Sequence, residues 1–186
     1  SGKIAEWEKQ SFRFIAPENG GISNMFPVKN IFTDKADRFW ASTSNGLMQF
    51  YPGKHRYIGH YLISQDRASA DCSDEINGIE QQNDSTLIVG TMRCGIFFFN
   101  TRSKKFTRYN DFPEVTATNI YAIKKESGNN ISMTSDYHIY QLRAVDNKLL
   151  KYDVPEGLMN SSFEMLNIYT LQHGNWLTAS KTEAII

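Results

Sequence analysis

Apolar and polar positions alternate along this chain in short runs, and the same order of runs recurs four times. Each copy has an apolar strand, a polar turn, a second strand ending in small or hydroxyl residues, a tight turn and an aromatic strand. Residues 39–44 alternate with a period of two, as in a strand that is packed on both faces. Because no segment has a convincing helical period, we predict an all-β protein.

The copies follow one another at a nearly constant spacing. The first three occupy residues 31–50, 79–99 and 123–142, and the fourth begins at Ile168. The positions that we align are Thr43, Thr91, Thr134 and Ala179, which are separated by 48, 43 and 45 residues. Repeats of about 40–50 residues with four short strands each are typical of β-propeller blades. The spacing therefore predicts a partial β-propeller of about four four-stranded antiparallel blades.

We treat residues 1–186 as one propeller fragment. The expected parts are an outer strand of a preceding blade at 12–15, blades at 26–61, 76–110 and 119–154, and the start of a further blade at 167–186. Because a blade buries its faces only against its neighbours, we expect an open stack to expose apolar faces at both ends. Such a stack would self-associate or be covered by other parts of the chain.

Some polar residues recur at the ends of the predicted strands. Asp34 and Asp37 are interpreted as solvated turn residues, and Asn45-Gly46 is a strong hairpin signal. The inner strands begin near Asn30, Asn77, Asn119 and Asn167. These amides either line the channel as a ring or cap backbone groups where each strand enters, and we favour the capping role.

Charge and cysteine content limit the classes of function. The chain has 20 basic and 20 acidic side chains and no clustered basic stripe, so we do not expect it to bind nucleic acid. No run approaches the roughly 18 apolar residues of a membrane span. A disulfide between Cys72 and Cys94 is possible if the loop before one blade folds over the turn of that blade. We favour two unpaired buried cysteines.

The recurring pattern resembles the repeat of the two-component regulator propeller family. The first copy matches that repeat at Trp40, Thr43, Gly46, Leu47 and Phe50. The second copy matches at Gly90, Thr91, Gly95, Ile96 and Phe97, whereas the later copies keep only Thr134 and Trp176. The resemblance covers most of residues 12–186.

This resemblance implies part of the periplasmic sensor region of a hybrid histidine kinase, an inner-membrane protein. Propellers of that family have about seven blades, so it also implies a fragment of a larger ring. The family is associated with sensing oligosaccharides and signals through packing or dimer rearrangement. We therefore expect three partners: an oligosaccharide or other small-molecule ligand, the remaining blades and domains of the parent chain, and a second parent chain in a homodimer. No cofactor is expected.

Propeller ligands bind where blades converge, on the face formed by the turns between second and third strands and by the loops that enter the innermost strands. The candidate ligand-binding residues are Asn45, Arg93, Tyr137, His138 and Lys181 from the turns, with Phe26, Tyr61 and Phe112 from the loops. Sugar recognition combines aromatic faces with planar polar groups, and this set supplies both. Taken singly, each residue is more simply explained as an ordinary rim residue.

The sequence predicts no catalytic and no metal-binding residues, so we expect this segment not to be an enzyme. The histidines His55, His60, His138 and His173 fall in different repeats, and nothing in their spacing requires a shared metal. The chain lacks a nucleophile elbow, a phosphate loop and a dinucleotide fingerprint. Two alternatives stay open: a propeller-fold polysaccharide lyase or hydrolase, and a protein-interaction propeller without the Gly-His and Trp-Asp signature of the WD class.

Overall fold

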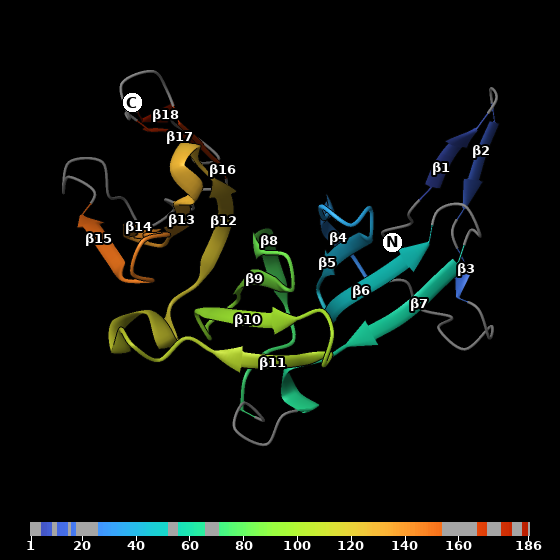
Figure 1. The fold of residues 1–186 in the computed structure, drawn as a ribbon, viewed down its shortest axis with the longest axis horizontal. Coiled ribbons are helices and arrows are strands. Elements are labelled where there is room, and N and C mark those ends of the chain that lie inside the picture. Colours follow the sequence, from blue (N-terminus) through green and yellow to red (C-terminus); the bar gives the residue numbers. More distant parts are fainter. Residues whose placement is uncertain are drawn as a thin grey trace.

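The computed structural model describes the backbone of residues 5–8, 11–14, 16–17, 26–51, 56–65, 71–153, 167–170, 176–179 and 184–185. Side chains are described at residues 26–51, 57–65, 71–153 and 168. The described chain forms an arc of antiparallel sheets (Figure 1).

Three of these sheets have four consecutive antiparallel strands, and we name them blades 1 to 3. Blade 1 contains β4 (Val28–Thr33), β5 (Phe39–Thr43), β6 (Gly46–Tyr51) and β7 (Arg56–Tyr61). Blade 2 contains β8 (Ile76–Asn83), β9 (Thr86–Thr91), β10 (Ile96–Asn100) and β11 (Lys105–Arg108). Blade 3 contains β12 (Ile120–Lys125), β13 (Ile131–Ser135), β14 (His138–Leu142) and β15 (Leu149–Asp153).

Shorter elements flank the three blades. Blade 4 has three described strands, β16 (Asn167–Thr170), β17 (Trp176–Ala179) and β18 (Ala184–Ile185). At the other end β1 (Ala5–Glu8) pairs with β2 (Ser11–Phe14), and β3 (Ala16–Pro17) adds a parallel fifth strand to β7 of blade 1. The helical segments in the described ranges are the short 3₁₀ turns η2 (Ile63–Gln65), η4 (Pro113–Ala117) and η5 (Ser127–Asn129).

The blades are arranged around a common axis. Their first strands lie on the inside of the arc and their fourth strands on the outside (Figure 1). Successive inner strands lie next to one another, with β4 beside β8, β8 beside β12, and β12 beside β16. This arrangement is a partial β-propeller, and the fold class predicted from the repeat spacing is confirmed.

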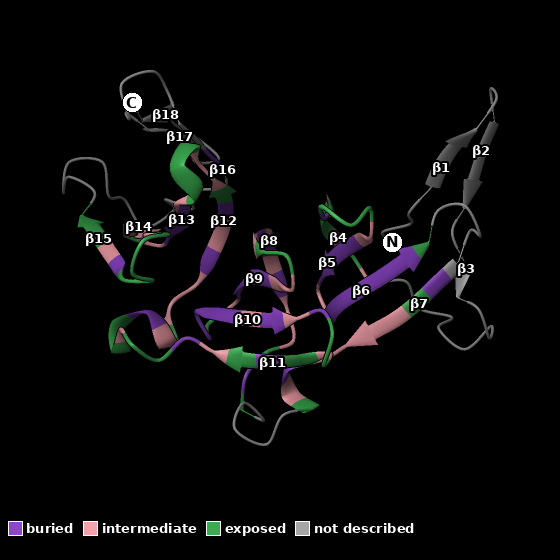
Figure 2. Ribbon diagram, in the orientation of Figure 1, coloured by how far each residue is buried: buried purple, intermediate pink, exposed green. Residues whose placement is uncertain are grey.

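Hydrophobic side chains fill the two interfaces between the described blades. The interface of blades 1 and 2 is built around Trp40, which is fully buried with Leu87, Val89 and Phe99. Blades 2 and 3 meet through Ile88, Ile120 and Tyr140 among others. Figure 2 shows the buried residues along β6, β9 and β10, whereas β11 on the outside of the arc is largely exposed. Burial against both neighbouring blades thus explains why β9 and β10 of blade 2 contain nearly continuous apolar runs.

A glycine sets the distance between blades 2 and 3. A Cβ atom at Gly90 would collide with the side chain of Ile120 on β12. Glycine at this position therefore lets β9 of blade 2 approach β12 of blade 3 closely, as is typical of glycine in strand interiors.

The turn before β5 is organised by a buried carboxylate rather than by a solvated one. Asp34 is only 3% exposed, so its interpretation as a solvated turn residue was wrong. Its oxygens accept hydrogen bonds from the indole Nε1 of Trp40 at 2.9 Å and from Nε of Arg38 at 2.7 Å. They also accept from the backbone N–H groups of Ala36 and Arg38. Asp37 is exposed in the same turn, as predicted.

The outward face of blade 1 is partly covered. Ala41, Met48, Phe50 and Tyr57 form a separate apolar cluster on this face, and each is at most 7% exposed. Ile31 pairs with Ala41 across β4 and β5 and is 51% exposed, so part of this face remains open. The expected exposed apolar face is therefore present only in part, because this cluster of blade 1 is covered.

Cys72 and Cys94 form a disulfide, with their Cα atoms 5.8 Å apart. The interpretation as two unpaired thiols was therefore wrong. The loop that precedes β8 folds over the β9–β10 turn, and this brings together two cysteines that are 22 residues apart. Their pairing fixes the loop to the turn that carries Arg93.

Candidate functional site

The turns between second and third strands are tied to the loops that enter the next blade. In blade 1 the N–H of Gly46 donates to the carbonyl of Asp74 at 2.7 Å, and in blade 2 the N–H of Gly95 donates to Thr118 at 2.9 Å. Both glycines have positive φ angles, 96° and 70°, and a Cβ at either would collide with a backbone carbonyl. Glycine is therefore required where turn and loop touch. We call this end of the stack the turn face.

A hydroxyl closes each of these turns. Thr43 Oγ1 donates to the carbonyl of Gly46 and Thr91 Oγ1 to that of Gly95, both at 2.9 Å. In blade 3 Ser135 Oγ donates to the carbonyl of His138 at 2.9 Å. The residue equivalent to Thr43 is therefore Ser135, so the alignment on Thr134 was wrong by one position. Adjacent hydroxyl residues made the two registers indistinguishable in sequence.

Four residues from blades 2 and 3 meet on the turn face, and we call them the Asn119 cluster: Arg93, Asn119, Tyr121 and Asp136. Asn119 Oδ1 accepts from the backbone N–H of Arg93 at 2.8 Å, and Asn119 Nδ2 donates to Asp136 Oδ1 at 3.1 Å. The phenol of Tyr121 donates to the same Asp136 oxygen at 2.6 Å. The cluster lies where the innermost strand of blade 3 begins, and Arg93 is exposed beside it.

The recurring asparagines act across blades. Asn77 Nδ2 donates to the carbonyl of Ile120 in the next blade at 3.1 Å, and Asn119 receives the N–H of Arg93 from the preceding blade. For these two residues backbone capping is confirmed, although the backbone belongs to a neighbour. Asn30 is exposed, and the side chain of Asn167 lies outside the described residues.

The predicted turn residues that the structure describes lie on the turn face but do not form one group. Arg93 belongs to the Asn119 cluster, and Tyr137 is 56% exposed next to Asp136. His138 turns outward, with Nδ1 3.1 Å from Asp153 Oδ1. The carbonyl of Asn45 lies 2.6 Å from His60 Nε2 in blade 1. Lys181 lies outside the described residues.

The predicted loop aromatics have packing roles. Tyr61 is the last residue of β7 and packs between Trp40 and Phe99 in the interface of blades 1 and 2. Phe26 stacks on His60, with ring centroids 5.7 Å apart, and Phe112 contacts Tyr140 at 6.2 Å. Burial raises the pKa of Tyr140, so this phenol stays neutral at ordinary pH.

The ligand-binding candidates predicted from the sequence did not include Asn119, Tyr121 and Asp136. Asn119 and Tyr121 are two positions apart at the start of a strand, and alternation places such residues on one face. Asp136 belongs to the same turn as Tyr137. These two signals together could have identified the cluster.

Neither a cluster of metal ligands nor a membrane-spanning helix is found among the described residues. Among them, no three His, Cys, Asp or Glu side chains lie close enough together to hold a metal ion. Nor is any helix in the described ranges long and apolar enough to cross a membrane.

Comparison with known proteins shows the fold. No family model matches the sequence, and no curated protein is similar to it in sequence. The extracellular domain of a protein assigned to the hybrid two-component systems of B. thetaiotaomicron aligns with a TM-score of 0.72 and 15% identity, covering 98% of this chain and 25% of that one. The chain thus spans about a quarter of the length of that domain.

Two propellers of other kinds align nearly as well. The WD40 propeller domain of Doa1 has a TM-score of 0.68 and 11% identity, covering 98% of this chain and 55% of that one. Virginiamycin B lyase from Staphylococcus aureus has a TM-score of 0.67 and 18% identity, with 98% and 57% covered. These similarities place the chain in the β-propeller class, which hosts sensing, binding and catalysis alike.

Proposed function

We propose that this chain is part of the extracytoplasmic sensor region of a hybrid two-component signalling protein, and that it binds an oligosaccharide without cleaving it. The similarity to the extracellular domain from B. thetaiotaomicron supports this function, as does the resemblance of the repeats. The disulfide between Cys72 and Cys94 supports a periplasmic location, because disulfides persist in oxidising compartments.

The Asn119 cluster is the main structural support for this proposal. An amide, a phenol and a carboxylate lie within 3.4 Å of one another at the convergence of two blades, next to the exposed Arg93. Such planar donors and acceptors form paired hydrogen bonds with vicinal hydroxyl groups. Because these side chains already support each other, a ligand would meet a rigid polar surface, which lowers the entropy lost on binding.

Signalling requires that the ligand bind one packing arrangement of the parent protein better than the other. The Asn119 cluster joins blade 2 to blade 3, so a ligand held there would stabilise one arrangement of these two blades. We propose that this preference passes to the membrane through the remaining domains and a parent homodimer.

Calorimetric titration against size-fractionated polysaccharide digests tests the proposal, with product analysis by chromatography. We expect saturable binding without cleavage, and a loss of about tenfold in affinity for Arg93→Ala, as for one charged hydrogen bond. Lys105→Ala removes an exposed cation from β11 and is the matched control. Equal affinity of the two variants would contradict the placement of the site. Cleavage would favour a lyase or hydrolase, and absence of binding would favour a protein partner.

A further inference from the structure

The two described blade interfaces are filled differently toward the outside of the propeller. Between blades 1 and 2 the ring of Trp40 contacts Phe99 edge-on, with centroids 5.5 Å apart. Lys104 from the β10–β11 turn reaches over Trp40, with Nζ 5.2 Å from the ring centroid and 3.1 Å from Gln49 Oε1. Indole and lysine together close this interface.

Smaller residues replace the tryptophan and the lysine between blades 2 and 3. Trp40 pairs with Gln49 across the sheet, and the equivalent pair in blade 2 is Ile88 with Phe98. Asn147 takes the place of Lys104: both have positive φ angles, 55° and 61°, and both N–H groups donate to the carbonyl four residues earlier. Isoleucine and asparagine fill less of this interface than indole and lysine do.

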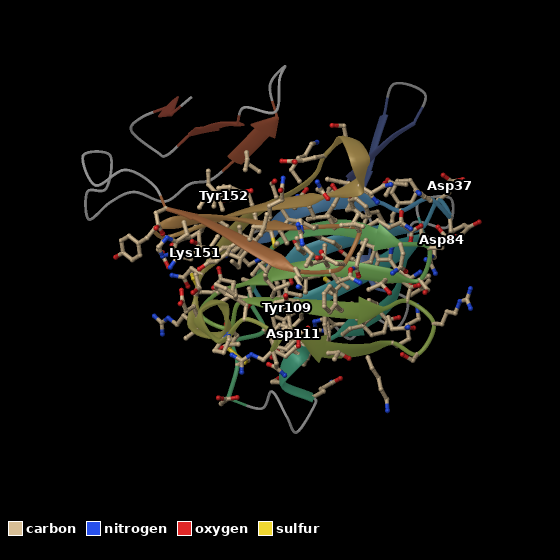
Figure 3. All side chains as sticks on the ribbon, turned by 60° about the vertical axis from the view of Figure 1, so that its left-hand side comes forward. Asp37, Asp84, Tyr109, Asp111, Lys151 and Tyr152 are labelled. Atoms are coloured by element: carbon tan, nitrogen blue, oxygen red, sulfur yellow. A yellow bond between two sulfur atoms is a disulfide. The ribbon has the colours of Figure 1, made fainter. Side chains whose placement is uncertain are left out.

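A groove of about 380 Å³ lies beside Phe98 and Asn147, on the flank of blades 2 and 3. We call it the flank groove. Phe98 and Tyr109 form its aromatic part, with rings 5.9 Å apart, and Figure 3 labels Tyr109 together with Asp111 on this flank. Gln82 and Asn147 form its amide part, joined by a hydrogen bond from Gln82 Nε2 to Asn147 Oδ1 at 3.1 Å.

A second hollow of about 320 Å³ adjoins the flank groove. It shares Gln82 and Asn147 and adds Asn83, Asn129 and Arg143. The hydrogen bond between Gln82 and Asn147 therefore lies between the two hollows. Gln82 is half-buried and Asn147 is exposed. A chain of more than one unit could lie across both.

We propose that the flank groove is a binding subsite for a neutral sugar unit of a glycan, separate from the Asn119 cluster. Aromatic rings suit the apolar faces of a sugar ring, and amides donate to and accept from its hydroxyl groups. Asp111 is the one ionisable carboxylate of the lining, and no lysine or arginine lines this groove, so its charge disfavours phosphate, sulfate or uronate. The volume is at the small end of ligand sites, as for one or two sugar units. This subsite shares its ligand class with the proposed function but not its location.

Calorimetry with maltose, cellobiose, mannobiose and lactose tests the subsite. Thr107 lines the groove from the exposed side of β11, so Thr107→Trp fills it without disturbing the core. Lys105→Trp places the same bulk on the same strand outside the lining and is the matched control. If Thr107→Trp does not fold, Asn147→Lys blocks the groove instead, since Lys104 shows that lysine adopts this conformation.

We expect at least one disaccharide to bind, with affinity reduced at least about tenfold in Thr107→Trp and unchanged in Lys105→Trp. Binding that survives in Thr107→Trp overturns the subsite, as does the absence of heat with all four sugars at millimolar concentration. A loss in Arg93→Ala alone would overturn the subsite while supporting the Asn119 cluster, so the two proposals fail separately.

Discussion

Asp34 stabilises both its own turn and the packing of blade 1 against blade 2. Its carboxylate is buried, yet it holds the indole of Trp40 in the interface with blade 2. Burial works to raise the pKa of Asp34, but hydrogen bonds from Trp40, Arg38 and the turn backbone outweigh it and lower the pKa overall. A satisfied buried carboxylate of this kind stabilises one turn geometry.

Replacing Asp34 by alanine should lower the free energy of unfolding by about 2–3 kcal/mol, because the indole N–H and two backbone N–H groups lose their acceptor. Urea unfolding followed by tryptophan fluorescence measures this change. Asp84→Ala, in the corresponding turn of blade 2, is the matched control because Asp84 is exposed at the molecular edge (Figure 3). We expect its effect to be within about 0.5 kcal/mol. Equal effects of the two substitutions would show that the buried network contributes nothing.

The same carboxylate predicts a pH dependence. Because the folded pKa of Asp34 is lowered, its contribution is complete above the unfolded value of about 3.9 and is lost as pH falls through the lower folded value. The difference in unfolding free energy between the wild type and Asp34→Ala should be constant from about pH 7 to 5 and should shrink below about pH 4. A difference that grows on acidification would contradict this sign.

Among the elements, the loop between β7 and β8 differs most from what sequence patterns suggest. It contains η2, the Asp74 carboxylate that accepts from the N–H and hydroxyl of Ser64, and the disulfide to the β9–β10 turn. The loop is therefore packed at the turn face, and its disulfide holds the turn that carries Arg93.

Reducing the disulfide should lower the free energy of unfolding by about 3 kcal/mol, the value expected for a closed loop of this size. Thiol titration with Ellman's reagent should find no free thiol in the denatured oxidised protein and two after reduction. The Cys72→Ser/Cys94→Ser variant should match the reduced protein in stability. Two free thiols before reduction would contradict the pairing.

Strand order and repeat spacing were predictable because they depend on local alternation, turn residues and a fixed period. The contacts of the site were not, because they join residues that are far apart in the sequence. Arg93 and Asn119 are 26 positions apart, and Cys72 and Cys94 are 22 apart. Likewise, the burial of Asp34 depends on the packing of blade 2 beside its turn. The residues of the turn alone do not predict that packing. The sequence thus predicted which turns form the turn face, but not which residues on it contact one another.

At the scale of the whole molecule, the described blades form one side of a propeller whose interfaces are not equivalent. The indole and lysine that close the first interface are absent from the second, where the Asn119 cluster lies at the inner strand and the flank groove at the outer strands. Both proposed binding features thus lie between blades 2 and 3. We therefore expect this interface, more than that of blades 1 and 2, to respond to a ligand.

Above all, we propose that an oligosaccharide binds to the turn face at the Asn119 cluster. Amide ¹H–¹⁵N spectra recorded during titration with the digest fraction that binds would test it directly. We expect the resonances of the Arg93 backbone amide and of the Asn119 side-chain amide to shift saturably, while those of the Gly46 turn in blade 1 do not move. Saturable shifts confined to residues away from Arg93, Asn119 and Tyr121 would contradict it.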